Sequence, residues 1–331
     1  LNYKLPLEYE KEIKKFWKEN FNLTVSSKGY NYFFASNQKQ NINYIPEDIF
    51  FKFIIRKLNK FSMAKAYADK NLYNKRFPDV DTPKTIIRNM NGRFFDEKYN
   101  LLSNEDAVNL VMSSITKDKV IVKPSIDSGG GKNITLIDIE TMNITNLENQ
   151  IKDILKGYSK DYIVQYYFYQ HDTLNEIYPF SLNTMRIITF ETNGKVEILA
   201  SVLKMGNNSN FLDKVSMGGL SCGINKDGKL NNYAYAKDIQ APLYSHPQTN
   251  FEFKDTIIPN FKEVALLVKQ LHMQISPYFR FISWDIALGK DANPVLIEVN
   301  LRNQGVMIPQ LNCGPIFGEQ TKDVLKGILQ D

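Results

Sequence analysis

The spacing of apolar residues predicts a helix over residues 7–21, close to the start of the chain. The apolar stripe of this helix consists of Leu7, Ile13, Phe16, Trp17 and Phe21. A second helical stretch is predicted over residues 46–72, and Thr145 and Gly157 are expected to open and close another helix. Further helices are predicted to begin at Ser103, at Asn260 and near Thr321.

Runs of β-branched residues predict strands that are joined as hairpins. Asn91-Gly92 and Asn193-Gly194 are turn signals between two pairs of strands. The runs "KVIVKPS" and "NITLIDI" flank a glycine-rich loop, "FISWDIAL" and "PVLIEVN" flank a polar turn, and "DYIVQYYFYQ" predicts a further strand. Because hairpins and helices are mixed and do not alternate as βαβ units, the pattern predicts an α+β fold.

The composition is ordinary for a globular protein, with 43% hydrophobic residues among 331. The net charge of +5, from 41 basic and 36 acidic side chains, suits an anionic ligand but is too small to indicate a nucleic-acid partner. Two cysteines and three histidines argue against a disulfide framework and a zinc site. No apolar stretch of about 18 residues is present, so no transmembrane segment is expected. The expected location is the cytoplasm, at most peripheral to the inner face of the membrane.

Three successive glycines lie in the loop between two predicted strands, at Gly129, Gly130 and Gly131. Glycine lets backbone N–H groups approach an anion closely, and Lys123 and Lys132 add positive charge. The loop lacks the spacing of a Walker A motif, and it joins two strands, which excludes the Rossmann fingerprint. It is interpreted either as a hairpin that closes over phosphates or as a plain surface hairpin tip.

Two carboxylates and an amide are predicted to share one face of the last hairpin. Glu298 and Asn300 are two residues apart on one strand, and Asp285 lies on the strand before it. Oxygen ligands of this kind suit Mg²⁺, and burying them without a cation would be costly. The alternative is a half-solvated hairpin face with ordinary polar residues.

Polar residues on other predicted strands allow both a functional and a structural interpretation. Gln165 either hydrogen-bonds a purine amino group or belongs to a plain core strand. Arg186, preceded by Asn183, either clamps a phosphate or faces solvent from an alternating strand. Arg302, which follows the Glu-x-Asn strand, has the same two interpretations.

These motifs, in this order, resemble the ATP-grasp superfamily. The order runs from Asp69-Lys70 through Lys123 and the glycine loop to the strand at Gln165 and the closing Asp285, Glu298 and Asn300. The segments "QYYFYQH", "SLNTMRIITF", "DKVSMGGL" and "SWDIAL…IEVN" look most like the branch associated with sugar transfer in surface-polysaccharide biosynthesis. The resemblance covers roughly residues 65–310.

The resemblance implies a fold in which two α+β subdomains hold ATP between antiparallel sheets. It assigns the metal, Mg²⁺, to Asp285, Glu298 and Asn300. It assigns the nucleotide to Lys70, Lys123, Ser128, Gly129, Gly130, Gly131, Lys132, Gln165, Tyr167, Phe168 and His171. Arg186, Arg302 and Asn183 are the expected catalytic residues.

Four regions are expected along the chain. A helical N-terminal region over residues 1–64 precedes the N-terminal part of the ATP-grasp module over residues 65–118. The glycine-lid subdomain is expected over residues 119–168, and the metal-binding and catalytic subdomain over residues 169–331.

Two departures from the family pattern leave contacts open. Many relatives carry an arginine two residues before the metal aspartate, where this chain has Ser283, so Arg186 or Arg280 is a candidate replacement. The ribose ligand is also open among His171, Asp172 and Glu176.

The resemblance implies an ATP-dependent ligase that joins a carboxylate to an amine through an acyl phosphate. The expected substrates are small molecules, namely an amino acid and a sugar or nucleotide sugar, and polysaccharide-assembly proteins are the expected protein partners. One alternative is a kinase of the same fold that phosphorylates a hydroxyl of a sugar or polyol. A second is a non-catalytic nucleotide-binding scaffold for glycosyltransferases.

Overall fold

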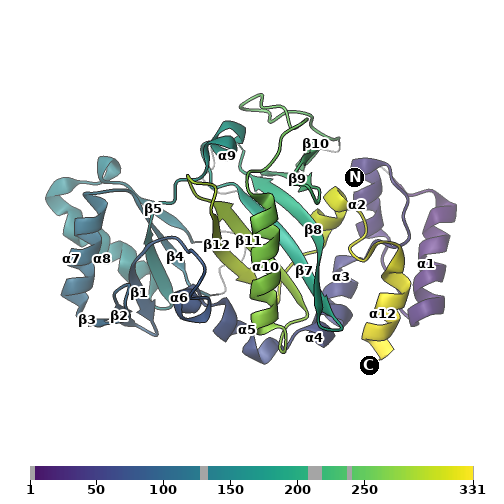
Figure 1. The fold of residues 1–331 in the computed structure, drawn as a ribbon, viewed down its shortest axis with the longest axis horizontal. Coiled ribbons are helices and arrows are strands. Elements are labelled where there is room, and N and C mark those ends of the chain that lie inside the picture. The colour runs from purple at the N-terminus through teal and green to yellow at the C-terminus, as the bar shows by residue number, and fades with distance from the viewer. Residues whose placement is uncertain (1–3, 127–132, 208–217, 237–240, 331) are drawn as a thin grey trace. The chain divides into compact units, whose positions relative to one another are not determined.

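The computed structural model describes residues 4–126, 133–207, 218–236 and 241–330. It contains two six-stranded sheets with helices mixed among the strands, which confirms the predicted α+β class (Figure 1). The chain divides into two compact units. Unit 1 consists of Leu1–Ser62, Gln170–Pro294 and Val299–Asp331, and unit 2 of Met63–Tyr169 and Val295–Glu298.

The first sheet belongs to unit 2 and has the strand order β3-β2-β1-β6-β4-β5. All neighbouring strands in it are antiparallel. Its strands are β1 (Thr85–Met90), β2 (Arg93–Phe95), β3 (Leu101–Leu102), β4 (Val120–Pro124), β5 (Thr135–Ile137) and β6 (Tyr162–Tyr166). The predicted hairpins at Asn91-Gly92 and around the glycine loop are both present as strand pairs.

Two helices, α7 (Asn104–Ile115) and α8 (Leu147–Tyr158), cover one face of this sheet (Figure 1). The predicted helix start at Ser103 is confirmed, because its side chain accepts a hydrogen bond from the Asp106 amide. The expected boundaries of the other helix were wrong, since α8 begins without a side-chain cap and runs through Gly157. Short helices precede β1 and connect β5 to α8. They are η2 (Lys70–Leu72) and α6 (Tyr73–Arg76) before β1, and η3 (Ile139–Thr141) and η4 (Ile144–Asn146) before α8.

The opposite face of the first sheet carries the polar side chains of interest. Tyr162 and Val164 pack into the core beneath α7 and α8, so Ile163 and Gln165 point to the other face. The pairing of β4 with β6 places Lys123 opposite Ile163, on this same face.

The second sheet has the strand order β10-β9-β8-β7-β11-β12. Its strands are β7 (Thr184–Thr192), β8 (Lys195–Met205), β9 (Leu220–Ile224), β10 (Leu230–Ala236), β11 (Phe281–Leu288) and β12 (Pro294–Asn300). The predicted hairpin at Asn193-Gly194 is confirmed, and a bulge shifts its register between Ile188 and Thr189. Helix α10 (Phe261–Ile275) covers one face, and α9 (Asp172–Ile177) precedes β7 (Figure 1).

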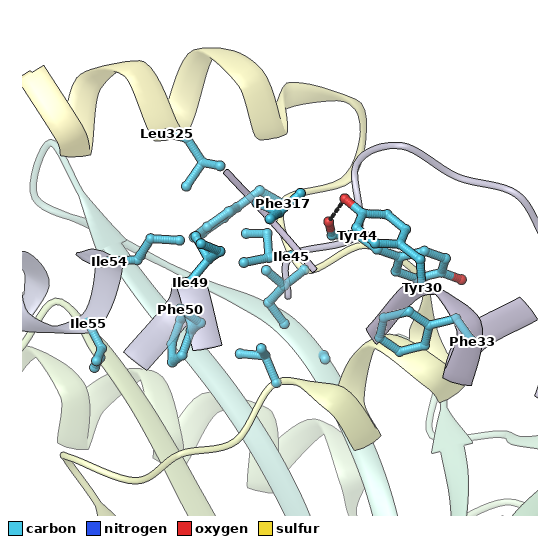
Figure 2. Packing of buried hydrophobic residues seen from close by; sticks show 14 of the residues in the cluster. Tyr30, Phe33, Tyr44, Ile45, Ile49, Phe50, Ile54, Ile55, Phe317 and Leu325 are labelled. Carbon is cyan, nitrogen blue, oxygen red and sulfur yellow. Dashed lines mark hydrogen bonds between the residues drawn. The ribbon is translucent and has the colours of Figure 1, made fainter. Parts of the chain in front are cut away.

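Helices from both ends of unit 1 cover part of the other face. They are α1 (Leu7–Phe21), α2 (Lys28–Asn37), α3 (Glu47–Ile49), η1 (Phe50–Ile54), α4 (Ile55–Leu58), α11 (Met307–Cys313), η6 (Gly318–Gln320) and α12 (Thr321–Gln330). Figure 2 shows how Ile49, Phe50 and Ile54 pack with Phe317 and Leu325 in their shared core. The aromatic N-terminal region is therefore a structural cover of this sheet.

Buried polar side chains fix this cover in place. Tyr30 accepts a hydrogen bond from the Trp17 indole (2.8 Å) and donates to the Tyr44 carbonyl (2.6 Å). Asn59 bonds both backbone groups of Phe281 (2.7 and 3.0 Å). The continuous helix predicted over residues 46–72 was wrong, because Asn59 adopts an extended conformation and α5 (Phe61–Ala68) starts anew after it.

Among the described residues, no helix combines the length and apolar character that crossing a membrane requires.

Candidate functional site

Two groups of ionisable side chains lie on the sheets, one in each unit. In unit 2, Lys70 is 7% exposed and its Nζ lies 2.7 Å from Oε1 of Glu298. Lys70 begins the short η2 helix, which lies against β1 and β6, and the side chain of Asp69 caps this helix by accepting from the Asn71 amide. A lysine fixed on a capped turn and paired with a carboxylate is held in one direction, unlike an ordinary surface lysine.

Lys123 adds a second positive charge to the same group. Burial is the main cause that lowers its pKa to about 8, the charge of Lys70 lowers it further, and Glu298 opposes both. Among the described residues, no carboxylate makes an ion pair with Lys123. Lys70 and Lys123 thus lie close enough for each charge to disfavour the other, and an added anion would offset this repulsion.

Gln165 lies on the same sheet face as Lys123 and is 5% exposed. Its amide nitrogen donates to the Pro83 carbonyl (2.8 Å), while its Oε1 is buried without a hydrogen-bond partner among the described residues. A buried acceptor left in this state is costly and suits a donor such as an amino group.

Tyr167 and Phe168 follow the end of β6 and are both half-buried. The Tyr167 amide donates to the Lys119 carbonyl (2.8 Å), which ties this connection to the sheet of unit 2. The two aromatic rings remain candidates for an adenine contact.

The group in unit 1 centres on Asp285, which is 4% exposed on β11. Arg186 stands opposite it on β7 and makes two hydrogen bonds to its carboxylate, Nε to Oδ1 (2.9 Å) and Nη2 to Oδ2 (2.8 Å). Lys204 on β8 also reaches Oδ2, at 3.2 Å. The two cations hold the pKa of Asp285 at about 2 against the effect of burial.

This group in unit 1 combines two cationic side chains with unused hydrogen-bonding atoms. Arg186 and Lys204 both contact the carboxylate of Asp285. Ser283 lies on the same face of β11, and its buried hydroxyl has no hydrogen-bond partner among the described residues. The buried Nδ2 of Asn300 also has no partner among them. Both features favour an anionic ligand on this face.

Lys204 was missed by sequence reasoning. In an unbroken hairpin from Asn193-Gly194, Arg186 would stand opposite Ser201. The bulge moves the pairing by one residue, so that Arg186 stands opposite Val202 and Thr184 opposite Lys204. A lysine in a long alternating strand was the only signal, and the pattern does not show which face it takes.

Asn183 has a different role from the one expected. It is fully buried, its Nδ2 donates to the carbonyls of Leu174 (2.7 Å) and Tyr178 (2.8 Å), and its amide donates to Gln170 (2.8 Å). These bonds brace the connection from α9 to β7 and occupy the side-chain nitrogen and the backbone amide of Asn183. Asn183 is therefore not carried into the site.

The remaining predicted residues have weaker support. His171 caps α9, where its Nδ1 accepts from the Thr173 amide (3.1 Å). Arg302 is exposed, with its guanidinium over the ring of Phe61 (5.2 Å). Arg280, a candidate replacement for the arginine missing at Ser283, lies 3.6 Å from Glu191 and away from Asp285 in the β11 register.

The predicted phosphate loop lies outside the described residues. This applies to Ser128, Gly129, Gly130, Gly131 and Lys132.

The donor set Asp285, Glu298 and Asn300 fits Mg²⁺ by its chemistry, because it offers carboxylate and amide oxygens only. Within the described ranges, no three His, Cys, Asp or Glu residues gather as a ready metal cluster. Each carboxylate instead contacts a cationic side chain of its own unit, Arg186 or Lys70. A magnesium ion would thus have to replace or share these ion pairs.

Two antiparallel sheets are the architecture that the motifs implied, and comparison with known families agrees. The profile of the family described as sugar-transfer associated ATP-grasp matches residues 52–326. The chain therefore belongs to this family, as its motifs predicted. No curated protein matches the sequence.

Several solved structures are distantly similar in fold. D-alanyl-alanine synthetase A from Vibrio cholerae O1 biovar eltor is 14% identical with a TM-score of 0.47, over 81% of this chain and 66% of that one. L-amino acid ligase from Bacillus licheniformis is 12% identical with a TM-score of 0.41, over 81% and 48%. The chain thus matches half to two thirds of the length of these proteins. At these scores the identification depends on the family match alone.

Proposed function

We propose that the protein is an ATP-dependent ligase that joins a carboxylate to an amine through an acyl phosphate. The observation that carries the proposal is the pairing of charges in each unit. The cations predicted for the phosphates contact the carboxylates predicted for the metal, as Lys70 does Glu298 and Arg186 does Asp285. Such pairs keep both charges satisfied until a polyanion and a divalent cation take their places.

The reaction requires positioning and charge neutralisation more than a protein nucleophile. In the first step, the substrate carboxylate attacks the γ-phosphoryl group, the bond to the β-phosphate oxygen breaks, and ADP leaves. In the second, the amine attacks the acyl carbon, phosphate leaves and the amine loses a proton. Lys70 and Lys123 bind phosphate oxygens, and Arg186 and Lys204 offset the charge of the transferred group.

The magnesium ion would be held by Asp285, Glu298 and Asn300 and would supply charge neutralisation for the phosphates. Gln165 accepts a hydrogen bond from the adenine amino group through its unpartnered Oε1. Tyr167 and Phe168 line the base, and His171 is the candidate for the ribose.

The proposed substrates are an amino acid and a sugar or nucleotide sugar, in surface-polysaccharide biosynthesis. The description of the family as sugar-transfer associated supports this choice. The net charge of +5 on the chain agrees with acidic small molecules as ligands.

A screen of amino acids and nucleotide sugars for ADP release, read by product mass, tests the proposal. We expect one pair to give a product that contains both substrates, with ADP and free phosphate in equal amounts. A product that carries the phosphate itself would identify a kinase instead. Binding of ATP without turnover for any acceptor would favour a scaffold.

A further inference from the structure

Every backbone group beside Lys70 has a hydrogen-bond partner in unit 2. The Lys70 amide donates to the Ser125 carbonyl (3.0 Å), and the Asn71 amide donates to the Asp69 carboxylate (3.0 Å). The side chain of Asn71 donates to the Asn89 carbonyl on β1 (2.9 Å). The backbone at Lys70 is thus fixed by its own amide and by the amide and side chain of Asn71.

The carbonyl of Asn71 is held by two side chains that the proposed function does not use. Arg88 donates to it from Nε (3.0 Å), and Tyr99 donates to it from its hydroxyl (2.8 Å). Arg88 also bonds the side chain of Asn74, which lies in the helix that follows the Lys70 turn. The two donors therefore hold the segment on both sides of its 3-10 turn.

Arg88 is an unusual residue for this position. It is 1% exposed on β1, and its guanidinium lies over the ring of Tyr99 (4.4 Å). None of the ion pairs among the described residues involves Arg88, and its Nη1 is buried without a partner. A guanidinium buried in this way costs more free energy than an apolar side chain of the same size, so its retention points to a specific role.

Tyr99 is held at some cost as well. Its φ of 67° lies in the left-handed region, which is rare for a bulky residue. Asp96 maintains the turn, because its carboxylate accepts from the amides of Lys98 and Asn100 (2.8 Å each). Strain of this kind collects where a geometry is functionally required.

We propose that Arg88 and Tyr99 are positioning residues that fix the Asn71 carbonyl and thereby aim Lys70. The inference rests on the proposed function, in which Lys70 binds the nucleotide phosphates. In the row Arg88, Ile163 and Lys123 across β1, β6 and β4, Arg88 stands two strands from the second phosphate-binding lysine. Lys123 thus lies on this sheet face itself, and Lys70 is connected to the same face by the bond from Arg88 to the Asn71 carbonyl.

Double-mutant calorimetry of ATP binding in the presence of magnesium tests the positioning role. The variants are Arg88→Met, Lys70→Met and both together, with Arg93→Met as the matched control on the exposed side of β2. Adenosine, measured by competition, reports the base site alone. A merely structural role would weaken ATP and adenosine alike, whereas positioning of Lys70 affects only the ligand with phosphates.

We expect Lys70→Met and Arg88→Met each to weaken ATP binding about tenfold, with adenosine unchanged and the double variant no weaker than either. Arg93→Met should bind as the native chain does. Additive losses, or an unchanged ATP dissociation constant in Arg88→Met, would overturn the positioning role while leaving the proposed function intact. An unchanged constant in Lys70→Met would remove Lys70 from the phosphate site, and the inference with it.

Tyr99→Phe keeps the test available if Arg88→Met does not fold. It removes one hydroxyl from the Asn71 carbonyl and leaves the ring over Arg88 in place. We expect ATP binding about threefold weaker and adenosine unchanged, as the loss of one hydrogen bond allows. Equal affinity of Tyr99→Phe and the native chain for ATP would contradict the role of this residue.

Discussion

The two faces of β11 differ in how completely their polar groups are satisfied. Trp284 and Asp285 are consecutive residues and therefore point to opposite faces of the second sheet. On the Trp284 face, the indole donates to Thr189 (2.8 Å), and Thr189 bonds Nδ1 of His272 (2.6 Å). His272 completes the chain through Nε2 to the Phe279 carbonyl (3.1 Å).

The network on the Trp284 face is neutral and closed. Burial lowers the pKa of His272 to about 4, so the imidazole carries no charge at neutral pH. The Asp285 face carries two cations, Arg186 and Lys204, and the buried hydroxyl of Ser283 there has no hydrogen-bond partner among the described residues. The comparison teaches that a buried polar group by itself indicates structure, and that an incomplete set of partners indicates a place for a ligand.

Removal of the carboxylate charge at Asp285 should have the largest effect. Asp285→Asn removes the buried carboxylate that pairs with Arg186 and Lys204, which lowers the free energy of unfolding by about 3–5 kcal/mol. Urea unfolding of the variant measures it. Asp291→Asn, an exposed change in the turn after β11, is the matched control. Equal stability of the two variants would mean that the charges on this face are not coupled.

The two faces of β11 should lose their contributions to stability in different pH ranges during acid unfolding. The folded pKa of His272 lies below its ordinary value of about 6.5, so the unfolded chain binds the proton first and stability falls as the pH drops from about 6.5 to about 4. The expected loss from this residue is about 3 kcal/mol. Asp285, with its pKa lowered to about 2, loses its contribution only below about pH 3.8.

The His272→Gln variant tests whether His272 causes the loss of stability between about pH 6.5 and pH 4. Glutamine can still donate to a carbonyl and does not titrate, so the dependence between pH 6.5 and 4 should flatten. An unchanged slope in the variant would place the titrating group elsewhere.

Glu298 provides a test in unit 2, because its carboxylate pairs with Lys70 at 2.7 Å and is proposed to hold the magnesium ion. Glu298→Gln should keep the fold and lower turnover about a hundredfold, through lost charge neutralisation at the transition state. ADP release at saturating ATP measures the change. Native turnover in the folded variant would remove Glu298 from the metal site.

Lys123 should show a smaller effect on binding alone. Lys123→Met preserves the length of the side chain and removes one charge near Lys70, so we expect ATP to bind about tenfold more weakly with little change in unfolding. Calorimetry with magnesium present measures the dissociation constant. Unaltered affinity would contradict a phosphate contact by this lysine.

Local signals predicted the local parts of the fold. Asn193-Gly194, Asn91-Gly92 and the cap at Ser103 each act within a few residues, and each feature is present. The apolar stripe over residues 7–21 gave the right helix, although Leu7 at its end is 74% exposed.

Features that depend on distant partners were not predictable. Asn59 interrupts the expected long helix because it pairs with the backbone of Phe281, which lies more than 200 residues away. Lys204 joins the site because of a bulge that the turn residues do not encode. The sequence shows Arg88 only as a residue of a predicted strand, because its hydrogen bond to the Asn71 carbonyl depends on the tertiary fold.

The most direct test of the account is a calorimetric titration of the native chain with ATP, with and without magnesium. The lysine that pairs with Glu298 and the two cations that contact Asp285 predict that ATP binds in both cases and more tightly when magnesium is present. The absence of binding heat under both conditions and over a range of temperatures would contradict the account.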